Sequence, residues 1–236
     1  MDSGPSSQFD RYASDYEHAL NQGIHVSGYR RDHFILRRIS YLARILRQIA
    51  ANQPIISVLD FGCSDGSTAP VLQEYFAPQR IVGVDSSDEC ILRARAMFGD
   101  HVASFESSSE YRPEATFDLC HTNGVFHHIP PDQRSSAVDL VFSSLVPGGY
   151  VALFENNPWN PGTRYVMSRI PFDRDARPMT PPAARSMLVE GGFSVLLTRS
   201  LFLFPSALAL LHPLEDLLGR YPIGAQYLVL ARKPGR

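Results

Sequence analysis

Two adjacent histidines, His127 and His128, follow one apolar run of the sequence and precede the dipeptide Ile129-Pro130. An unperturbed imidazole titrates near neutral pH and can act as a general base. Glu155 ends a later apolar run, and a carboxylate beside an imidazole orients the ring for proton transfer. The alternative is that one histidine packs in the wall of the fold and the other lies on the surface. His127, His128 and Glu155 are therefore the candidate catalytic residues.

A turn of small residues runs from Asp60 to Ser67, after another apolar run. Gly62 and Gly66 allow the backbone to turn sharply and to approach a ligand, and the helix that follows begins with free N–H groups. A dinucleotide-binding fingerprint would need glycine at Ser64 and at Ser67, so that motif fits poorly. The two carboxylates of the turn favour a ligand with an ammonium or sulfonium charge. The alternative is a generic turn between a strand and a helix.

Asp85 ends the next apolar run, about 20 residues beyond the turn, where a carboxylate accepts hydrogen bonds from the two hydroxyls of a ribose. The alternative is that Asp85 caps the helix that follows. Ser86 and Ser87 already supply capping oxygens, however, which favours the ribose role for Asp85. Ser107 follows the third apolar run, where an adenine edge would lie. These positions together indicate a nucleoside site.

The elements that must position these residues alternate between strand and helix from residue 54 onward. This alternation predicts an α/β fold with a parallel, doubly wound sheet and helices on both faces. The expected strands are 55–60, 81–85, 102–105, 117–121, 150–155, 193–204 and 226–231, and the expected helices are 10–21, 32–50, 68–76, 88–98, 131–145, 181–190 and 206–218. In such sheets ligands bind beyond the carboxyl ends of the strands, so the candidate residues should meet at one edge.

The composition restricts the class of protein. The 236 residues carry 22 Lys+Arg and 24 Asp+Glu, a net charge of -2, and 44% of them are hydrophobic, which fits an ordinary globular domain. The near-neutral charge argues against bulk nucleic-acid binding, and no apolar stretch is long enough to span a bilayer. Three widely spaced cysteines form neither a disulfide framework nor a zinc pattern. We therefore expect a cytoplasmic protein with no metal site.

We expect two regions along the chain. Residues 1–53 would form an N-terminal helical lid and a first amphipathic helix. Residues 54–236 would form the ligand-binding domain, with substrate-side insertions at 156–180 and 205–222. The aromatic and apolar side chains of these insertions suit a small organic ligand that is partly apolar or aromatic. The protein is expected to be a monomer or a homodimer.

These features together resemble the class I S-adenosylmethionine-dependent methyltransferases, in their small-molecule branch. The resemblance is carried by the turn 58–66, by Asp85, by 117–130 with its His-His-Ile-Pro loop, and by the Leu-Val-Pro-Gly-Gly turn 145–149. It implies a Rossmann-like, seven-stranded sheet with an antiparallel last strand, and S-adenosylmethionine as cofactor. It covers residues 55–155 well and is more diffuse at 9–29.

The resemblance also implies a place for each residue around the cofactor. Asp60, Gly62 and Gly66 would surround the methionine moiety, Asp85 with Ser86 the ribose, Ser107 the adenine, and Asn123 and Gly124 the sulfonium. Tyr12 is the candidate aromatic ring over the cationic sulfur. Cys63 and Ser64 belong to the same turn, where they replace the Gly-Thr or Gly-Ser pair common in the family.

We therefore expect transfer of a methyl group from S-adenosylmethionine to a small organic acceptor, because such a protein mainly aligns the reactants and removes a proton. A base at His127 or His128, oriented by Glu155, favours O-methylation. Three alternatives stay open. They are an NAD(P)-dependent oxidoreductase of the same architecture, an RNA methyltransferase that uses the six arginines of 30–47, and a nucleoside-binding protein without catalysis.

Overall fold

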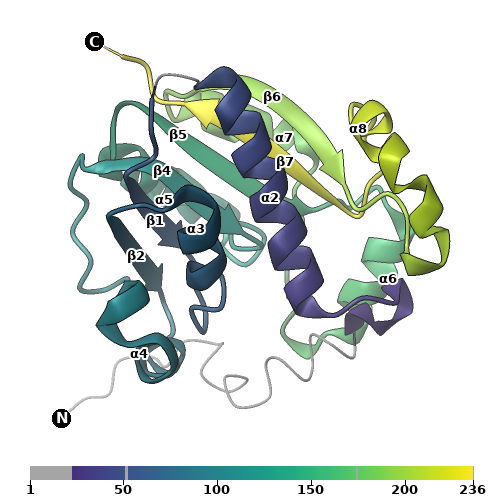
Figure 1. The fold of residues 1–236 in the computed structure, drawn as a ribbon, viewed down its shortest axis with the longest axis horizontal. Coiled ribbons are helices and arrows are strands. Elements are labelled where there is room, and N and C mark those ends of the chain that lie inside the picture. Colours follow the sequence, from purple (N-terminus) through teal and green to yellow (C-terminus); the bar gives the residue numbers. More distant parts are fainter. Residues whose placement is uncertain (1–22, 51–52, 174, 236) are drawn as a thin grey trace.

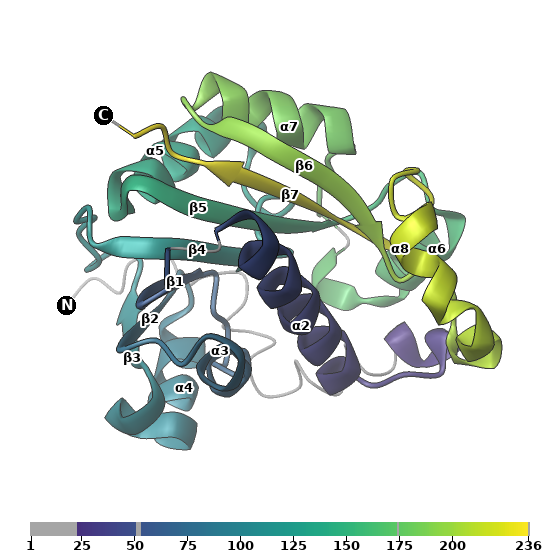
Figure 2. The same cartoon turned by 45° about the horizontal axis from the view of Figure 1, so that its top comes forward.

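The computed structural model describes residues 23–50, 53–173 and 175–235. The predicted helix 10–21 and Tyr12 lie outside the described residues. The described chain folds around one seven-stranded sheet with helices on both of its faces, as Figures 1 and 2 show. No described helix is long and apolar enough to cross a membrane.

The strands lie in the order β3-β2-β1-β4-β5-β7-β6. Their bounds are β1 Ser57–Phe61, β2 Arg80–Asp85, β3 Ser104–Ser107, β4 Phe117–Asn123, β5 Leu145–Asn156, β6 Ser194–Leu201 and β7 Gln226–Arg232. Strands β1 to β5 pair in parallel, and β7 runs antiparallel between β5 and β6. The predicted Rossmann-like sheet with an antiparallel last strand is confirmed.

The helices that cover the sheet are α2 Arg31–Ile49, α3 Ala69–Phe76, α4 Asp88–Val102, α5 Arg134–Ser144 and α7 Pro181–Glu190. The described residues also form α6 Pro161–Arg169, α8 Glu215–Leu218 and the 3-10 helices η2 His25–Ser27, η3 Pro131–Gln133, η4 Pro171–Asp173 and η5 Ser206–Leu214. Figure 2 shows α2, α3 and α4 on one side of the sheet and α5 and α7 on the other.

Several segments differ from the sequence prediction. Strand β5 begins at Leu145, five residues earlier than expected, and β6 ends at Leu201, three residues earlier than expected. Helix α4 continues through a kink at Gly99, so β3 begins two residues later than expected. The segment 206–218 is not one α-helix, because η5 covers 206–214, with a kink at Leu208 and with Pro213 near its end, and only α8 is α-helical. Residues 156–180, which show no clear period, contain α6, and the side chain of Asn160 caps its first turn by accepting a hydrogen bond from the Thr163 N–H.

The core has two layers because successive strand residues point to opposite faces of the sheet. In β1, Val58 packs with Ile39 of α2 and Leu72 of α3, whereas Leu59 packs with the helices of the other face. The side chains of Val58, Leu59 and Leu72 are fully buried. The order of the strands reverses between β1 and β4, and this reversal opens a crevice beyond their carboxyl ends.

Candidate active site

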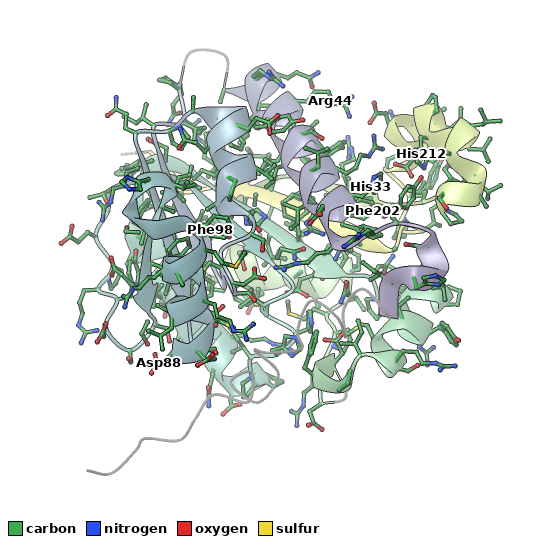
Figure 3. All side chains as sticks on the ribbon, turned by 60° about the horizontal axis from the view of Figure 1, so that its bottom comes forward. His33, Arg44, Asp88, Phe98, Phe202 and His212 are labelled. Atoms are coloured by element: carbon green, nitrogen blue, oxygen red, sulfur yellow. The ribbon has the colours of Figure 1, made fainter. Side chains whose placement is uncertain are left out.

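A cavity of ≈ 420 Å³ lies at the carboxyl ends of β1 and β4. Its lining comes from the turn after β1, the loop after β4, the start of α2, the helices α6 and η4, and the segment from β6 to η5. Figure 3 shows His33, Phe202 and His212 gathered beside the start of α2, and all three line the cavity. Tyr29 stacks on His33 and its hydroxyl lies 3.2 Å from Nε2 of His212, so this wall is aromatic with a few polar groups.

The turn after β1 needs glycine at two positions. Gly62 has a φ of +78°, and a Cβ atom there would lie 2.1 Å from Cγ2 of Val125 in the loop after β4. Gly66 has a φ of +77°, and a Cβ atom would lie 2.8 Å from the ring of Phe105. The turn therefore packs directly against its neighbours, and its residues Gly62, Cys63 and Ser64 line the cavity.

Asp85 ties the end of β2 to this turn. One carboxylate oxygen accepts a hydrogen bond from the Ser64 N–H at 2.8 Å, and the other accepts one from the Ser87 N–H at 2.9 Å. Burial raises the pKa of Asp85, and the hydrogen bonds from these amides oppose that rise. Each carboxylate oxygen has a second lone pair, so Asp85 can still accept hydrogen bonds from a ligand.

A buried pair, Asp60 and His121, lies beneath the cavity where β1 and β4 are neighbours. Nδ1 of His121 is 2.7 Å from Oδ1 of Asp60, and both side chains are almost fully buried. Asp65 stands apart from this pair because Arg31 binds it through two hydrogen bonds of 2.5 and 2.7 Å. Burial would raise the pKa of Asp65, but the bonds from Arg31 outweigh burial and lower it. Of the two carboxylates that the sequence placed at the turn, Asp65 is thus already paired.

Glu155 and His127 join β5 to the loop after β4. Oε2 of Glu155 lies 2.5 Å from Nδ1 of His127, and Oε1 accepts a hydrogen bond from the Phe126 N–H at 2.8 Å. Glu155 has no exposed surface. Both oxygens of this buried carboxylate are therefore satisfied by consecutive residues of one loop, which fixes the loop and the orientation of the imidazole.

Asp173 of η4 completes the cluster from the opposite side. Its Oδ1 lies 3.7 Å from Nε2 of His127 and 3.3 Å from Nε2 of His128. The two imidazole rings are 4.1 Å apart between centroids. The segment after η4 is held to the same loop, because the Arg177 N–H donates to the His127 carbonyl at 2.7 Å.

The cluster gives its two histidines opposite charge states. Burial opposes a charge on His127, but Glu155 and Asp173 outweigh it and raise the pKa of His127 to about 10. Burial lowers the pKa of His128, and His127 lowers it further, while Asp173 acts in the opposite sense. Burial would raise the pKa of Asp173, but its hydrogen bonds with the two histidines lower it. At neutral pH His127 is thus a cation between two carboxylates, and His128 is a neutral imidazole.

Comparison with known proteins identifies the family. A model of the methyltransferase domain matches residues 7–182 of this chain, which is more than half of its length. The chain belongs to the methyltransferase domain family. The resemblance to class I S-adenosylmethionine-dependent methyltransferases is therefore confirmed, and S-adenosylmethionine is the cofactor of this domain.

Curated relatives match the methyltransferase domain over part of their length. Trans-aconitate 2-methyltransferase of Escherichia coli is 26% identical over 143 residues, which cover 61% of this chain and 56% of that protein. The enzyme of the same name from Azoarcus is 27% identical over 137 residues, covering 57% of this chain and 53% of that protein. The chain thus spans about half the length of the curated relatives that it matches.

Solved structures share the fold at low sequence identity. A putative methyltransferase from Haloferax volcanii, solved with its Trm112 activator, superposes with a TM-score of 0.65 at 18% identity, covering 96% of this chain and 98% of that one. Magnesium protoporphyrin IX methyltransferase from Synechocystis, solved with bound S-adenosylhomocysteine, gives a TM-score of 0.61 at 17% identity over 95% and 96% of the two chains. These similarities support the methyltransferase fold.

The residues of the methyltransferase domain fit a nucleoside with a cationic amino-acid tail. Several buried acceptor atoms at the cavity have no hydrogen-bond partner among the described residues, and these are Oδ2 of Asp60, Nε2 of His121 and Oδ1 of Asn123. An unpaired buried acceptor is costly, so a bound donor is expected there. The glycine turn and the carboxylate of Asp85 lie next to these atoms along the edge of the sheet.

The predicted cofactor residues fall into two groups. Six of them line the cavity, and they are Asp60, Gly62, Cys63, Ser64, Asn123 and Gly124. The other four described residues do not line the cavity, and they are Gly66, Asp85, Ser86 and Ser107. Gly66 is buried against Phe105, and Asp85 accepts a hydrogen bond from the Ser64 N–H of the turn. Ser86 is exposed, whereas Ser107 is buried, with its hydroxyl 3.0 Å from that of Ser109. Their roles at the ribose and adenine stay predictions.

Two functional candidates were absent from the sequence-based set. Asp173 lies in an aperiodic segment, so no pattern placed it beside the histidines. His121 lies in the predicted strand 117–121, and nothing in the sequence distinguishes a ligand-binding histidine there from one that is packed in the core. The ligand atoms of His127, His128 and Asp173 lie within 4.8 Å of one another, which is close enough for a shared cation. We interpret their contacts as hydrogen bonds and ion pairs, because each has a partner of opposite polarity within the cluster.

Proposed function

We propose that this protein transfers a methyl group from S-adenosylmethionine to an oxygen of a small, partly apolar acceptor, and that His128 takes up the proton of the acceptor. The observation that carries the proposal is the difference in charge between two adjacent histidines that line one cavity. His127 is held between Glu155 and Asp173, whereas His128 contacts Asp173.

The cofactor would be held by the residues at the carboxyl ends of β1, β2 and β4. The turn at Gly62 and Ser64 allows close approach of its backbone, Asp85 can accept from ribose hydroxyls, and Asp60 faces the cationic end. When bound, S-adenosylmethionine supplies a methyl group already activated by the positive sulfur. The remaining task of the chain is to orient the acceptor, exclude water and remove one proton.

His128 is the better base because a general base must be unprotonated at the working pH. Burial lowers the pKa of His128, so its imidazole is neutral at pH 7. After it accepts a proton, the nearby carboxylate of Asp173 stabilises the imidazolium. The raised pKa of His127, about 10, leaves that ring already protonated. We assign His127 and Glu155 as positioning residues that hold the loop and, through Asp173, the ring of His128.

The acceptor would lie in the part of the cavity formed by the substrate-side segments. Met167, Phe172 and Phe202 line it with apolar surface, while Asn160 and Arg38 supply polar groups. A cavity of ≈ 420 Å³ suits a small organic molecule. Trp159 and Tyr165, two aromatic residues of the same segments, are about half exposed and lie outside the lining among the described residues.

The proposal is tested by supplying methyl-labelled S-adenosylmethionine with a panel of phenols, aliphatic alcohols and carboxylic acids, and by measuring labelled product and S-adenosylhomocysteine. We expect label on a hydroxyl oxygen, and a rate about 10²-fold to 10⁴-fold lower in His128→Asn. His101→Asn is the matched control, because His101 is exposed on α4, and its rate should equal that of the unmodified protein.

Other outcomes would contradict the proposal in distinct ways. A carboxylate is ionised at neutral pH and needs no base, so label on carboxylic acids with full activity in His128→Asn would remove the proton-transfer step. Label in RNA that disappears with rising salt would indicate a nucleic-acid substrate. Cofactor binding without any product would indicate a binding protein.

A further inference from the structure

Three acceptor atoms at the cavity are buried without a hydrogen-bond partner among the described residues. They are Oδ2 of Asp60, Nε2 of His121 and Oδ1 of Asn123, and all three residues line the cavity. Asp60 and His121 are each only 2% exposed. Buried polar atoms in proteins are nearly always hydrogen-bonded, so three orphans at one cavity indicate a ligand group that binds there.

The sheet places the three atoms on one face. Asp60 of β1 and His121 of β4 are direct neighbours in the register, and Asn123 is two residues further along β4, where side chains return to the same face. Nδ1 of His121 lies 2.7 Å from Oδ1 of Asp60. A carboxylate only accepts, so the shared hydrogen belongs to Nδ1, and an imidazole that carries its single hydrogen there presents a lone pair at Nε2. Asp60 thus fixes the imidazole with an acceptor directed away from the carboxylate.

The chemistry of the three atoms selects their ligand. A group that satisfies a carboxylate, an imidazole lone pair and an amide oxygen must donate several N–H bonds, and a positive charge suits the carboxylate best. We propose that His121 is a recognition residue for the ammonium group of the cofactor's methionine moiety, which it binds through Nε2 together with Asp60. The inference rests on the proposed function, in which Asp60 faces the cationic end of the cofactor, and it adds His121 as a second residue for the same group.

This arrangement makes the ammonium group a requirement for tight binding. A nucleoside that lacks the amino-acid tail leaves the three atoms buried and unpaired, and sites built to bond a polar group discriminate strongly against ligands without it. His121 should therefore contribute to the preference for a nucleoside with an amino-acid tail over one without it, and contribute little to the binding of the adenosine part.

The experiment compares two nucleosides by calorimetric titration. S-Adenosylhomocysteine carries the ammonium group, and 5′-methylthioadenosine lacks the amino-acid part. The variant is His121→Asn, because an asparagine amide reproduces Nδ1 and its bond to Asp60 but has no atom at the position of Nε2. We expect His121→Asn to weaken S-adenosylhomocysteine about tenfold or more and to leave the affinity for 5′-methylthioadenosine within about twofold.

Thr122→Val is the matched control. Thr122 is the next residue of β4, its hydroxyl is equally buried without a partner, and among the described residues it does not line the cavity. This variant should change neither affinity, and a thermal unfolding scan should show that both variants are folded.

Three results would overturn the inference. Unchanged affinity of His121→Asn for both nucleosides would assign Nε2 to a water molecule. Equal weakening of both nucleosides would instead give His121 a general role in shaping the cleft. If the unmodified protein bound neither nucleoside, the cofactor site itself would be wrong, and labelled-methyl transfer to an acceptor, measured separately, would still report on the proposed function.

Discussion

Glu155 accepts a hydrogen bond from Nδ1 of His127 at 2.5 Å, and the two residues come from different elements, the end of β5 and the loop after β4. The second oxygen of Glu155 binds the backbone N–H of Phe126. A single buried carboxylate therefore fixes both the position of the loop and the direction of the ring. Asp173 then approaches His127 and His128 from η4. This relationship leads to the first two predictions.

Replacing Glu155 by glutamine should destabilise the fold. The amide cannot compensate the buried charge of His127, and removing one partner of a buried ion pair costs about 3 kcal/mol or more. The free energy of unfolding, measured by urea denaturation, should fall by about this amount. Glu190→Gln on the exposed surface of α7 is the control and should change it by less than about 0.5 kcal/mol. Equal changes in the two variants would show that the Glu155–His127 pair does not stabilise the protein.

The two histidines should titrate at opposite ends of the pH range. Glu155 and Asp173 raise the pKa of His127 to about 10, so its ring should stay doubly protonated from neutral pH up to that value. Burial lowers the pKa of His128 below its usual 6.5, so its ring should be neutral at pH 7 and gain a proton only in more acidic solution. The charged groups that face the pair are Glu155 and Asp173. Nitrogen NMR of histidine-labelled protein reports each ring directly.

The rate of methyl transfer should follow the titration of His128. The kcat/KM should rise as pH passes upward through the lowered pKa of His128 and should be level at neutral pH. If His127 were the base, the rate would continue to rise towards pH 10, because only then does that ring lose its proton. A profile that climbs above pH 8 and survives in His128→Asn would therefore transfer the catalytic role to His127.

Gly62→Ala should impair cofactor binding. A Cβ atom would lie 2.1 Å from Cγ2 of Val125, and the φ of +78° is strained for any L side chain. Overpacking and backbone strain each cost about 1–3 kcal/mol. We expect weaker binding of S-adenosylhomocysteine by calorimetry and a lower free energy of unfolding. Gly235→Ala meets nothing within 4 Å and should leave both quantities unchanged. Normal binding in Gly62→Ala would show that the turn does not contact the cofactor.

Chelation should leave the activity intact. We interpret the cluster of His127, His128 and Asp173 as a hydrogen-bonded ion-pair network, although its ligand atoms lie within 4.8 Å of one another. Activity on the identified acceptor should therefore be the same before and after dialysis against a strong chelator. If dialysis abolished the activity and Zn²⁺ or Mg²⁺ restored it, these residues would bind a metal, and the assignment of His128 as the base would be wrong.

The features of the fold and of the site that depend on local sequence patterns could be predicted. The alternation of strands and helices was sufficient for the sheet, and the small residues of the turn marked its ligand-facing edge because Gly62 and Gly66 both require a conformation that favours glycine. The pairing of His127 with Glu155 was also within reach, since both residues end or follow neighbouring strands and the carboxyl ends of parallel strands meet at one edge.

Contacts set by tertiary packing were beyond the sequence. Asp173 contacts the histidines because η4, which follows α6, lies against the loop after β4. No periodicity in the sequence indicates this packing. Arg31 neutralises Asp65 from the start of α2, so one of the two expected carboxylates is already paired. The pKa of His127 is raised because Glu155 and Asp173 both contact its ring, whereas burial lowers the pKa of His128. Two adjacent letters in a sequence cannot show this difference.

The most direct measurement of the central claim is a crystal structure of the protein with S-adenosylhomocysteine. The account predicts that the ribose hydroxyls lie within hydrogen-bonding distance of Asp85, that the ammonium group meets Asp60, and that the sulfur faces the side of the cavity that carries His128. A nucleoside bound away from Asp85 and Asp60, or one whose sulfur points away from His128, would contradict it.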